Sequence, residues 1–309
     1  GAGLTDWNEE LLDCPGWAWW AHARRRGLQV WGSAGHCRYT GFTVLVLALD
    51  FDGVISDSAP EAFLVALRAY LDFLADSTLS RVSEEVETGP GDLLGRVRGS
   101  VTYGAFVEAM PLGNRAEDFA VVLHAIEHNV PLKDQQAYQR HRDLLAPEFL
   151  AGFHTRFYER RTAWAESDPE GWTALMAPYP KLPALLRRWS PRVGLAIVTA
   201  KDRTSVRRLL SSYGIADLFA DEFLFDKEMG VSKCAHLEAL KTRMDCDYSN
   251  ITFVDDKVNH LQEAARLGVR CVLSGWGYNG PREAKIARHA GFRVCDLDNL
   301  EEQLLPHDP

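Results

Sequence analysis

Two aspartates directly follow a strongly apolar stretch, and their spacing is suited to chemistry. The apolar run 44–49 ends at Asp50, and Asp52 comes two residues later. A short run of Val and Leu that ends in polar residues predicts a buried β-strand. Residues i and i+2 of an extended chain point to the same side, so the two carboxylates would face one pocket. Such a pair requires a cation or a shared proton, and its oxygen ligands suit Mg²⁺.

The composition is that of a soluble globular protein. The chain has 309 residues, of which 46% are hydrophobic and 25% charged, enough for one large or two modest domains. A formal net charge of -9 argues against broad nucleic-acid binding. There is no apolar run of transmembrane length, so we expect no membrane span. The six cysteines are scattered without CxxC pairs, which predicts reduced thiols in a cytoplasmic protein.

Residues 1–42 do not match the pattern of the rest of the chain. They hold five tryptophans and a run of three arginines, without a clear period. A cationic, Trp-rich stretch is typical of a helix that binds a membrane surface or a partner. The alternative, which we favour, is a non-native or poorly ordered leader. In either case we expect the folded core to begin near residue 43.

Helical patterns fill the chain from 58 to 178. Ser58, followed by Pro60 and Glu61, is a plausible helix start. The apolar positions that follow have a helical period, and β-alternation is not sustained anywhere in this stretch. We therefore predict an all-helical domain at 58–178, with helices that include 106–110, 119–126 and 138–164.

Strands and helices alternate from 179 onwards. This alternation predicts βαβ units, a mostly parallel sheet and helices on both faces, hence an α/β fold. The core domain would combine 43–57 with 179–309, and the helical domain would be inserted between its first two strands. The predicted strands cover 193–198, 222–225, 251–254, 270–273 and 292–295, and the predicted helices cover 205–212, 234–243, 258–267, 282–290 and 297–305.

Polar residues that could join the first two aspartates stand at the ends of these elements. Thr199 ends a strand, although many strands end in Thr without a function. Lys233 stands near a helix start, where Lys227 is a rival and either could be a surface lysine. Asp255 and Asp256 end another strand together. Adjacent acids after an apolar strand are rarely structural, because burial penalises both charges.

Together these segments resemble the four motifs of the haloacid dehalogenase superfamily. The matching segments are DFDGVISDS, GLAIVTAKD, the helix start at Lys233 and ITFVDDKVNHLQEAARLG, in that order. The core looks most like the phosphoglycolate-phosphatase-like branch. The resemblance implies a Rossmann-like core domain with an inserted helical cap, the C1 cap, that excludes water and selects substrates.

The resemblance also implies catalytic roles. Asp50 would attack phosphorus and form an aspartyl-phosphate, while Asp52 would act as the general acid and base. The Thr199 hydroxyl, the Ala200 backbone N–H and Lys233 would bind the phosphoryl oxygens.

A metal site is implied by the same motifs. Mg²⁺ would bind Asp50, the backbone carbonyl of Asp52 and Asp256, and Asp255 would be a second ligand or an outer-shell group. An unusual outer shell is predicted by two departures from the family's pattern, Lys257 for a common Ser and His260 for a second Asp.

The predicted function is Mg²⁺-dependent hydrolysis of a small phosphorylated metabolite. Dehalogenating and phosphonate-cleaving relatives lack an acid in the place of Asp52, which favours a phosphate ester as the substrate. One alternative is a sugar phosphomutase on the same core. Another is a non-catalytic binding protein, although the intact motif residues argue against it. Arginines of the helical domain would either bind a substrate anion or form surface ion pairs: Arg96, Arg98, Arg156, Arg160 and Arg161.

Overall fold

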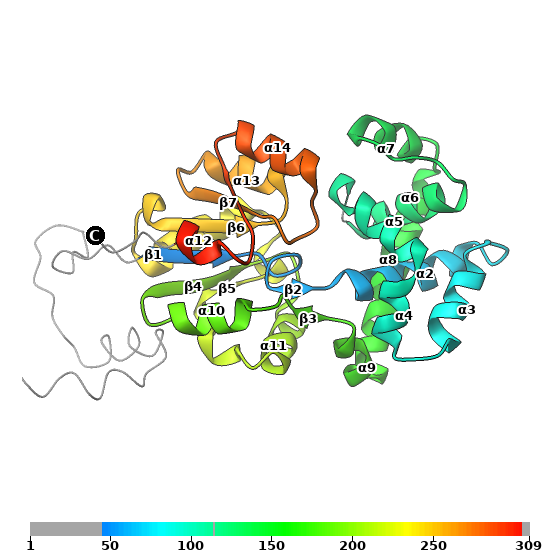
Figure 1. Ribbon diagram of the computed structural model, residues 1–309, viewed down its shortest axis with the longest axis horizontal. Helices are drawn as coiled ribbons and strands as arrows, with labels where there is room; N and C mark the ends of the chain where they lie inside the picture. Colours follow the sequence, from blue (N-terminus) through cyan, green and yellow to red (C-terminus); the bar gives the residue numbers. More distant parts are fainter. Residues whose placement is uncertain (1–44, 114, 305–309) are drawn as a thin grey trace, which may run out of the picture. The chain divides into compact units, whose positions relative to one another are not determined.

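The computed structural model describes residues 45–113 and 115–304. These residues form two compact units, one built around a sheet and one built from helices (Figure 1). The leader 1–42 and the end of the last predicted helix lie outside the described residues. The sheet unit consists of 45–56, 178–277 and 284–304, and the helical unit consists of 57–177 and 278–283.

A six-stranded parallel sheet forms the core of the first unit. The strand order is β5-β4-β1-β6-β7-β8, and each neighbouring pair is parallel. The predicted α/β fold is therefore confirmed. The strands are β1 (Leu45–Leu49), β4 (Val193–Val198), β5 (Leu224–Phe225), β6 (Ile251–Asp255), β7 (Arg270–Ser274) and β8 (Arg293–Cys295).

The first strand, β1, lies in the middle of this sheet. Leu49 stands opposite Ile197 of β4 and Val254 of β6. All five residues of β1 are buried or half-buried, as expected for a strand covered on both faces. Because the strands are parallel, the residues that follow β1, β4 and β6 meet at one edge of the sheet.

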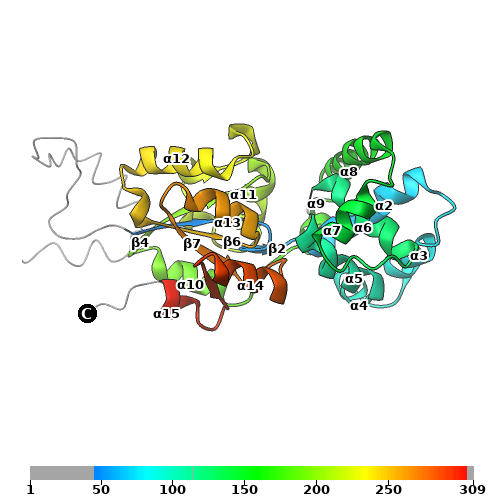
Figure 2. The ribbon, with the colours of Figure 1, turned by 90° about the horizontal axis from the view of Figure 1, so that it is seen from above.

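Helices cover both faces of the sheet. Helix α12 lies on the opposite face from α10 and α15 (Figure 2). Leu237 and Leu240 of α12 pack with Leu261 of α13 in one apolar cluster against the sheet. The helices are α10 (Leu182–Trp189), α11 (Arg203–Ser212), α12 (Lys233–Met244), α13 (Val258–Ala265), α14 (Pro281–His289) and α15 (Leu300–Leu304), and the short 3₁₀ turns are η2 (Ala216–Leu218), η3 (Asp221–Phe223), η4 (Lys227–Met229) and η5 (Tyr248–Asn250).

The second unit is built around α2. This helix is apolar on most sides and packs against α6 and α8. The chain crosses between the units at β2 (Ser56–Asp57) and β3 (Ala177–Pro178), which pair with each other. The helices are α2 (Ala59–Phe73), α3 (Ser80–Thr88), α4 (Leu93–Gly99), α5 (Val101–Ala109), η1 (Met110–Leu112), α6 (Ala116–Glu127), α7 (Gln135–Arg142), α8 (Pro147–Ser167) and α9 (Pro169–Ala174).

The single helix predicted over 138–164 is wrong, because the chain forms two helices there. Helix α7 ends at Arg142, and α8 begins at Pro147. The ring of a proline disfavours helical backbone in the residue before it, and Ala146 has an extended ψ of 132°. Across the described part of the chain, α8 included, we find no helix with the length and apolar character needed to span a membrane.

Arginines on α8 form ion pairs with α2. Arg160 binds Asp72 at the surface, with 2.8 Å between Nε and Oδ2. Arg161 makes two bonds of 2.8 and 2.6 Å to Glu61, a carboxylate with no exposed surface. Glu61 also accepts a bond of 3.1 Å from the Trp172 indole. These contacts favour ion pairing over substrate binding as the role of Arg160 and Arg161. The pair of Arg161 with Glu61 is buried, whereas the pair of Arg160 with Asp72 is at the surface.

We expect Arg161→Met to lower the free energy of unfolding by about 3–5 kcal/mol, because it leaves the buried Glu61 carboxylate without its counter-charge. Arg160→Met is the matched control and should cost only about 0–1 kcal/mol, since its pair is exposed to water. Urea denaturation of both variants measures the difference. Equal losses in the two variants would contradict the distinction.

Candidate functional site

Asp50 is fixed at the sheet edge by backbone contacts. Its N–H donates to the Val254 carbonyl at 3.0 Å, which extends the ladder between β1 and β6 by one residue. Its Oδ1 accepts a bond of 2.7 Å from the Phe51 N–H. The chain then turns at Gly53, whose φ of +79° suits glycine. The Asp50 carboxylate is therefore buried and held in one orientation.

Lys233 supplies the cation beside Asp50. It opens α12 after Ser232, whose hydroxyl caps the helix. Its ammonium lies 2.8 Å from Asp50 Oδ1 and donates to the Val198 carbonyl at 2.8 Å. Burial alone would lower the pKa of Lys233, but the nearby aspartates outweigh it and raise that pKa. Lys227, the rival lysine, is exposed on η4.

Asp255 is buried within a set of donors. The Nδ1 of His260 lies 3.1 Å from both carboxylate oxygens, and the Lys257 N–H donates to Oδ1 at 2.8 Å. Burial acts to raise the pKa of Asp255, but Lys233 and His260 lower it to about 2. Ligand atoms of Asp50, Asp255 and His260 lie within 4.8 Å of one another. Asp255 is thus an ionised carboxylate whose oxygens lie close to Asp50 and His260.

The surroundings of Asp256 and Asp50 disfavour the ionised forms of both carboxylates. Burial raises the pKa of Asp256 to about 7, helped by Asp255 and Asp50 and opposed by Lys257, whose ammonium lies 3.7 Å from Oδ2. Burial likewise raises the pKa of Asp50 to about 6 against the pull of Lys233. Crowded, buried carboxylate oxygens of this kind fit a hard divalent cation, which would relieve their repulsion.

Asp52 has a cationic partner that the sequence analysis missed. The ammonium of Lys201 lies 3.1 and 3.3 Å from the two oxygens of Asp52. Only 4% of the Lys201 side chain is exposed, against 37% for Asp52. The signal was present in the motif TAKD, where a lysine follows two residues after the strand-ending Thr199. That signal was weak, because most lysines near a strand end are solvated.

Thr199 and Ala200 lie at the end of β4. The Thr199 N–H donates to the Phe225 carbonyl at 2.9 Å, and its hydroxyl accepts a bond of 3.1 Å from the Lys201 N–H. Thr199 is buried, whereas Ala200 is exposed. The same short turn therefore holds a hydroxyl group and the lysine that pairs with Asp52.

Gly277 brings another loop against the site. A Cβ atom at this position would lie 2.3 Å from the Gly53 carbonyl oxygen and 2.5 Å from the Asp256 Cβ. Both are closer than real side-chain contacts, so only glycine fits without a shift of the backbone. The indole of Trp276 donates to the Val54 carbonyl at 3.0 Å. This loop thereby fixes the turn that follows Asp50.

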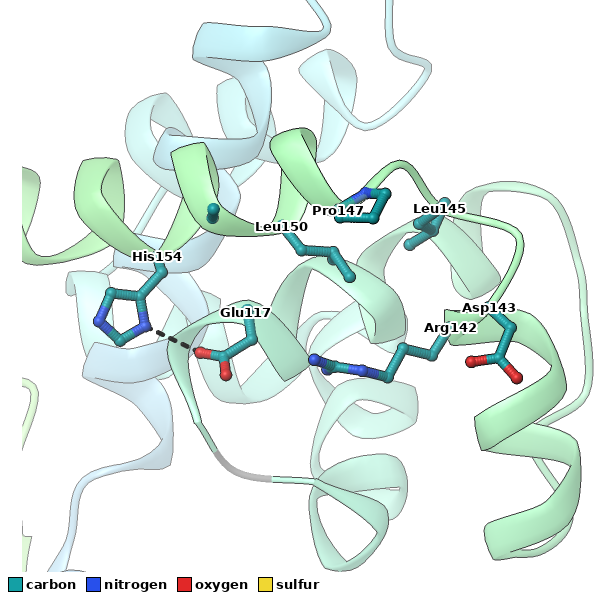
Figure 3. Close-up of a pocket in the computed structure, with 8 residues that line it drawn as sticks. Glu117, Arg142, Asp143, Leu145, Pro147, Leu150 and His154 are labelled. Atoms are coloured by element: carbon teal, nitrogen blue, oxygen red, sulfur yellow. Dashed lines mark hydrogen bonds and ion pairs between the residues drawn. The ribbon is translucent and has the colours of Figure 1, made fainter.

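A separate cavity of about 570 Å³ lies within the helical unit (Figure 3). Three of its lining residues already form ion-pair contacts, since His154 Nδ1 lies 2.8 Å from Glu117 and Arg142 lies 2.7 Å from Asp118. None of the sequence-predicted site residues lines it. The cavity is lined by residues of α6, α7, α8 and the segment before α8: Glu117, Arg142, Asp143, Leu145, Pro147, Leu150, Ala151 and His154.

Comparisons with known proteins show similarity in sequence profile and in fold. The sequence profile of the haloacid dehalogenase-like hydrolases matches residues 44–268. A predicted phosphoglycolate phosphatase from Haemophilus somnus has a similar fold, with 19% identity and a TM-score of 0.51 over 85% of this chain and 98% of that one. A putative phosphoglycolate phosphatase from Lactobacillus delbrueckii shares 14% identity with a TM-score of 0.59, over 86% and 100%. No curated protein matches the chain.

The raised pKa of Asp256 predicts a pH-dependent stability. The folded state holds this proton more tightly than the unfolded chain does, so its contribution is complete below the ordinary value of 3.8 and is lost as the pH rises through about 7. In the absence of divalent cations, Asp256→Asn should raise the free energy of unfolding by about 2–4 kcal/mol near pH 8.

Urea denaturation in a chelating buffer measures this effect. The control is the same pair of proteins near pH 4. The variant and the wild type should differ much less there, because Asp256 is protonated in the folded protein at that pH. A variant no more stable than the wild type at the higher pH would contradict the assigned charge crowding.

Proposed function

The chain belongs to the haloacid dehalogenase-like hydrolase family, as its four motifs predicted, and from this premise we propose that it hydrolyses a small-molecule phosphate monoester. The observation that carries the proposal is the pairing of each of two neighbouring aspartates with its own buried lysine. Asp50 pairs with Lys233, and Asp52 pairs with Lys201. Lys233 favours the anionic form of Asp50 that the attack would require, and Lys201 would hold the Asp52 carboxylate for proton transfer.

Mg²⁺ is the cofactor that these residues fit. The carboxylates of Asp50 and Asp256 and the backbone carbonyl of Asp52 would hold it, with Asp255 as an outer-shell acceptor bound to His260. When bound, the ion would neutralise charge between the anionic nucleophile and the anionic phosphate. The raised pKa values of Asp50 and Asp256 support this assignment, because a divalent cation would stabilise both ionised carboxylates.

The proposed reaction runs in two displacements on phosphorus. A carboxylate oxygen of Asp50 attacks phosphorus, and the bond to the ester oxygen breaks. The leaving alcohol takes its proton from Asp52, which must be protonated at that moment. Asp52 then removes a proton from a water that attacks the aspartyl-phosphate, and inorganic phosphate leaves as the bond to Asp50 breaks.

Groups on the neighbouring turns would bind the phosphoryl oxygens. The Lys233 ammonium already lies beside Asp50 and would contact the transferred group as it approaches. The hydroxyl of Thr199 and the N–H of Ala200 stand at the end of the adjacent strand β4. Their donor groups would stabilise the charge that spreads over the equatorial oxygens.

An acid two residues after the nucleophile supports a phosphate ester as the substrate. The dehalogenating and phosphonate-cleaving members of this family lack an acid in the place of Asp52. Two of the structural neighbours above are described as predicted or putative phosphoglycolate phosphatases. A small phosphorylated carboxylic acid is therefore the first substrate class that we would assay.

Phosphate release should depend on Mg²⁺ and on Asp50. We expect Asp50→Asn to lower turnover by at least about 1,000-fold, because the amide cannot act as the nucleophile. A panel of small phosphate monoesters, assayed with Mg²⁺ and with chelator, measures this. If no free phosphate appears while a sugar 1-phosphate is converted to the 6-phosphate, the enzyme is a mutase instead.

Lys201→Met should act through the proton-transfer step. We expect kcat on alkyl phosphates to fall by about 10–100-fold, since Asp52 loses the group that holds it. The loss should be much smaller on p-nitrophenyl phosphate, whose leaving group needs no proton. Lys227→Met is the matched control and should behave like the wild type. An equal loss on both classes of substrate would mean that Lys201 has only a structural role.

A further inference from the structure

Lys257 places a buried ammonium group against the carboxylate of Asp256. The Nζ atom of Lys257 lies 3.7 Å from Asp256 Oδ2, and only 7% and 2% of the two side chains are exposed. The backbone of Lys257 joins the same cluster, because its N–H donates to Asp255 Oδ1 at 2.8 Å. A lysine side chain normally extends into water, so its burial here requires that the aspartates compensate the lost solvation.

Lys257 is an unfavourable residue for the helix that it precedes. It is the N-cap residue of α13, a position where Ser, Thr, Asp and Asn are preferred. A lysine ammonium only donates hydrogen bonds, so it cannot accept one from the N–H groups of the first turn. Its positive charge also opposes the helix dipole, whose positive end is at the N-terminus. The chain thus gives up helix stability at this residue, and the side chain contacts Asp256 instead.

This pair differs from the pair at the proposed nucleophile. Lys233 lies beside Asp50 and is proposed to bind the transferred phosphoryl group, so its charge serves both the nucleophile and the substrate. The proposed reaction needs no cation at Lys257. The Lys257 ammonium nevertheless lies against Asp256, one of the two carboxylates that would hold Mg²⁺. A positive charge beside that carboxylate repels a second cation.

The ammonium of Lys257 and a divalent cation would compete for the same carboxylate. In the metal-free protein, the Lys257 charge offsets part of the repulsion among the buried carboxylates of Asp50, Asp255 and Asp256. With the cation bound, Asp256 would have a stronger partner. The two positive charges would then repel each other in a buried site, where water screens them only weakly. The same lysine would therefore stabilise the metal-free site and destabilise the metal-bound one.

We propose that Lys257 is an internal counter-ion that competes with Mg²⁺ for Asp256 and thereby weakens the binding of the cation. The proposal rests on the Mg²⁺ site proposed above, and it adds a residue that sets the affinity of that site. Mg²⁺ would bind only at a concentration high enough to displace the ammonium from the carboxylate. Phosphate release would therefore follow the concentration of free Mg²⁺.

Mn²⁺ binding to the metal-free full chain near pH 8 tests the proposal, because electron paramagnetic resonance distinguishes free Mn²⁺ from bound Mn²⁺. Added Mg²⁺ displaces the bound Mn²⁺, and this competition measures the affinity for Mg²⁺. Lys257→Met removes the charge and keeps most of the side chain's length. We expect it to bind both ions about 10–100-fold more tightly than the wild type, the usual size of outer-shell effects. Lys257→Ser should change both affinities in the same direction.

A proton also gains from the loss of this lysine, because Asp256 then has one neighbouring cation fewer. A divalent ion gains more than a proton does, since it carries twice the charge. Protonation of Asp256 therefore does not reverse the expected direction of the change in metal affinity.

Two control variants separate the role of Lys257 from the metal site itself. Lys227→Met removes an exposed lysine of the same unit and should bind Mn²⁺ like the wild type. Asp256→Asn should bind Mn²⁺ much more weakly, as the proposed Mg²⁺ site requires. If Asp256→Asn keeps the wild-type affinity, both the assignment of Asp256 and the role of Lys257 are overturned. If Asp256→Asn loses binding while Lys257→Met binds no more tightly than the wild type, only the role of Lys257 is overturned.

Urea denaturation in a chelating buffer near pH 8 is a second measurement, and it also shows whether the variants fold. Lys257→Met should lower the urea midpoint more in the wild-type background than in the Asp256→Asn background, because the second background lacks the carboxylate that the ammonium neighbours. Equal shifts in the two backgrounds would mean that Lys257 and Asp256 are not coupled. That result would overturn the proposal, whatever the metal affinities are.

Discussion

The site depends on a balance of buried charge at the carboxyl edge of the sheet. Asp50, Asp255 and Asp256 are all buried, and lysines compensate them only in part. Lys233 lies against Asp50 and also approaches Asp255 at 3.6 Å, while it donates to a backbone carbonyl of β4. Removing a charge from water costs several kcal/mol unless partners replace the lost solvation. The lysines and His260 supply some of these partners, and the proposed Mg²⁺ would supply the rest.

The sheet makes this balance possible by bringing distant residues to one edge. Asp50, Thr199 and Asp256 each follow or end a parallel strand, and the register sets Leu49 beside both Ile197 and Val254. Because all these strands point the same way, their polar ends meet without any long loop. The backbone bonds of Asp50 then fix its carboxylate, so the sheet itself positions the group that we propose as the nucleophile.

Much of the fold could be predicted from the sequence, since its local signals were strong. Strand 193–198 has the predicted bounds, because apolar residues flanked by polar ones define it. The break before Pro147 was missed because the apolar positions on both sides keep a helical period. Lys201 and the pairing of Glu61 with Arg161 were missed for a different reason. Such contacts join residues far apart in the chain, and no local pattern marks which charges will be buried together.

The central place of β1 has a consequence for how the protein is made. Its partners β4 and β6 follow only after the whole helical unit, since Val46 pairs with Gly194 and Ile251. Contacts between such distant residues form slowly, whereas helical units fold quickly from local contacts. During synthesis β1 would therefore remain unpaired while α2 to α9 are added. An unpaired apolar strand favours aggregation, so we expect the nascent chain to be vulnerable during this interval.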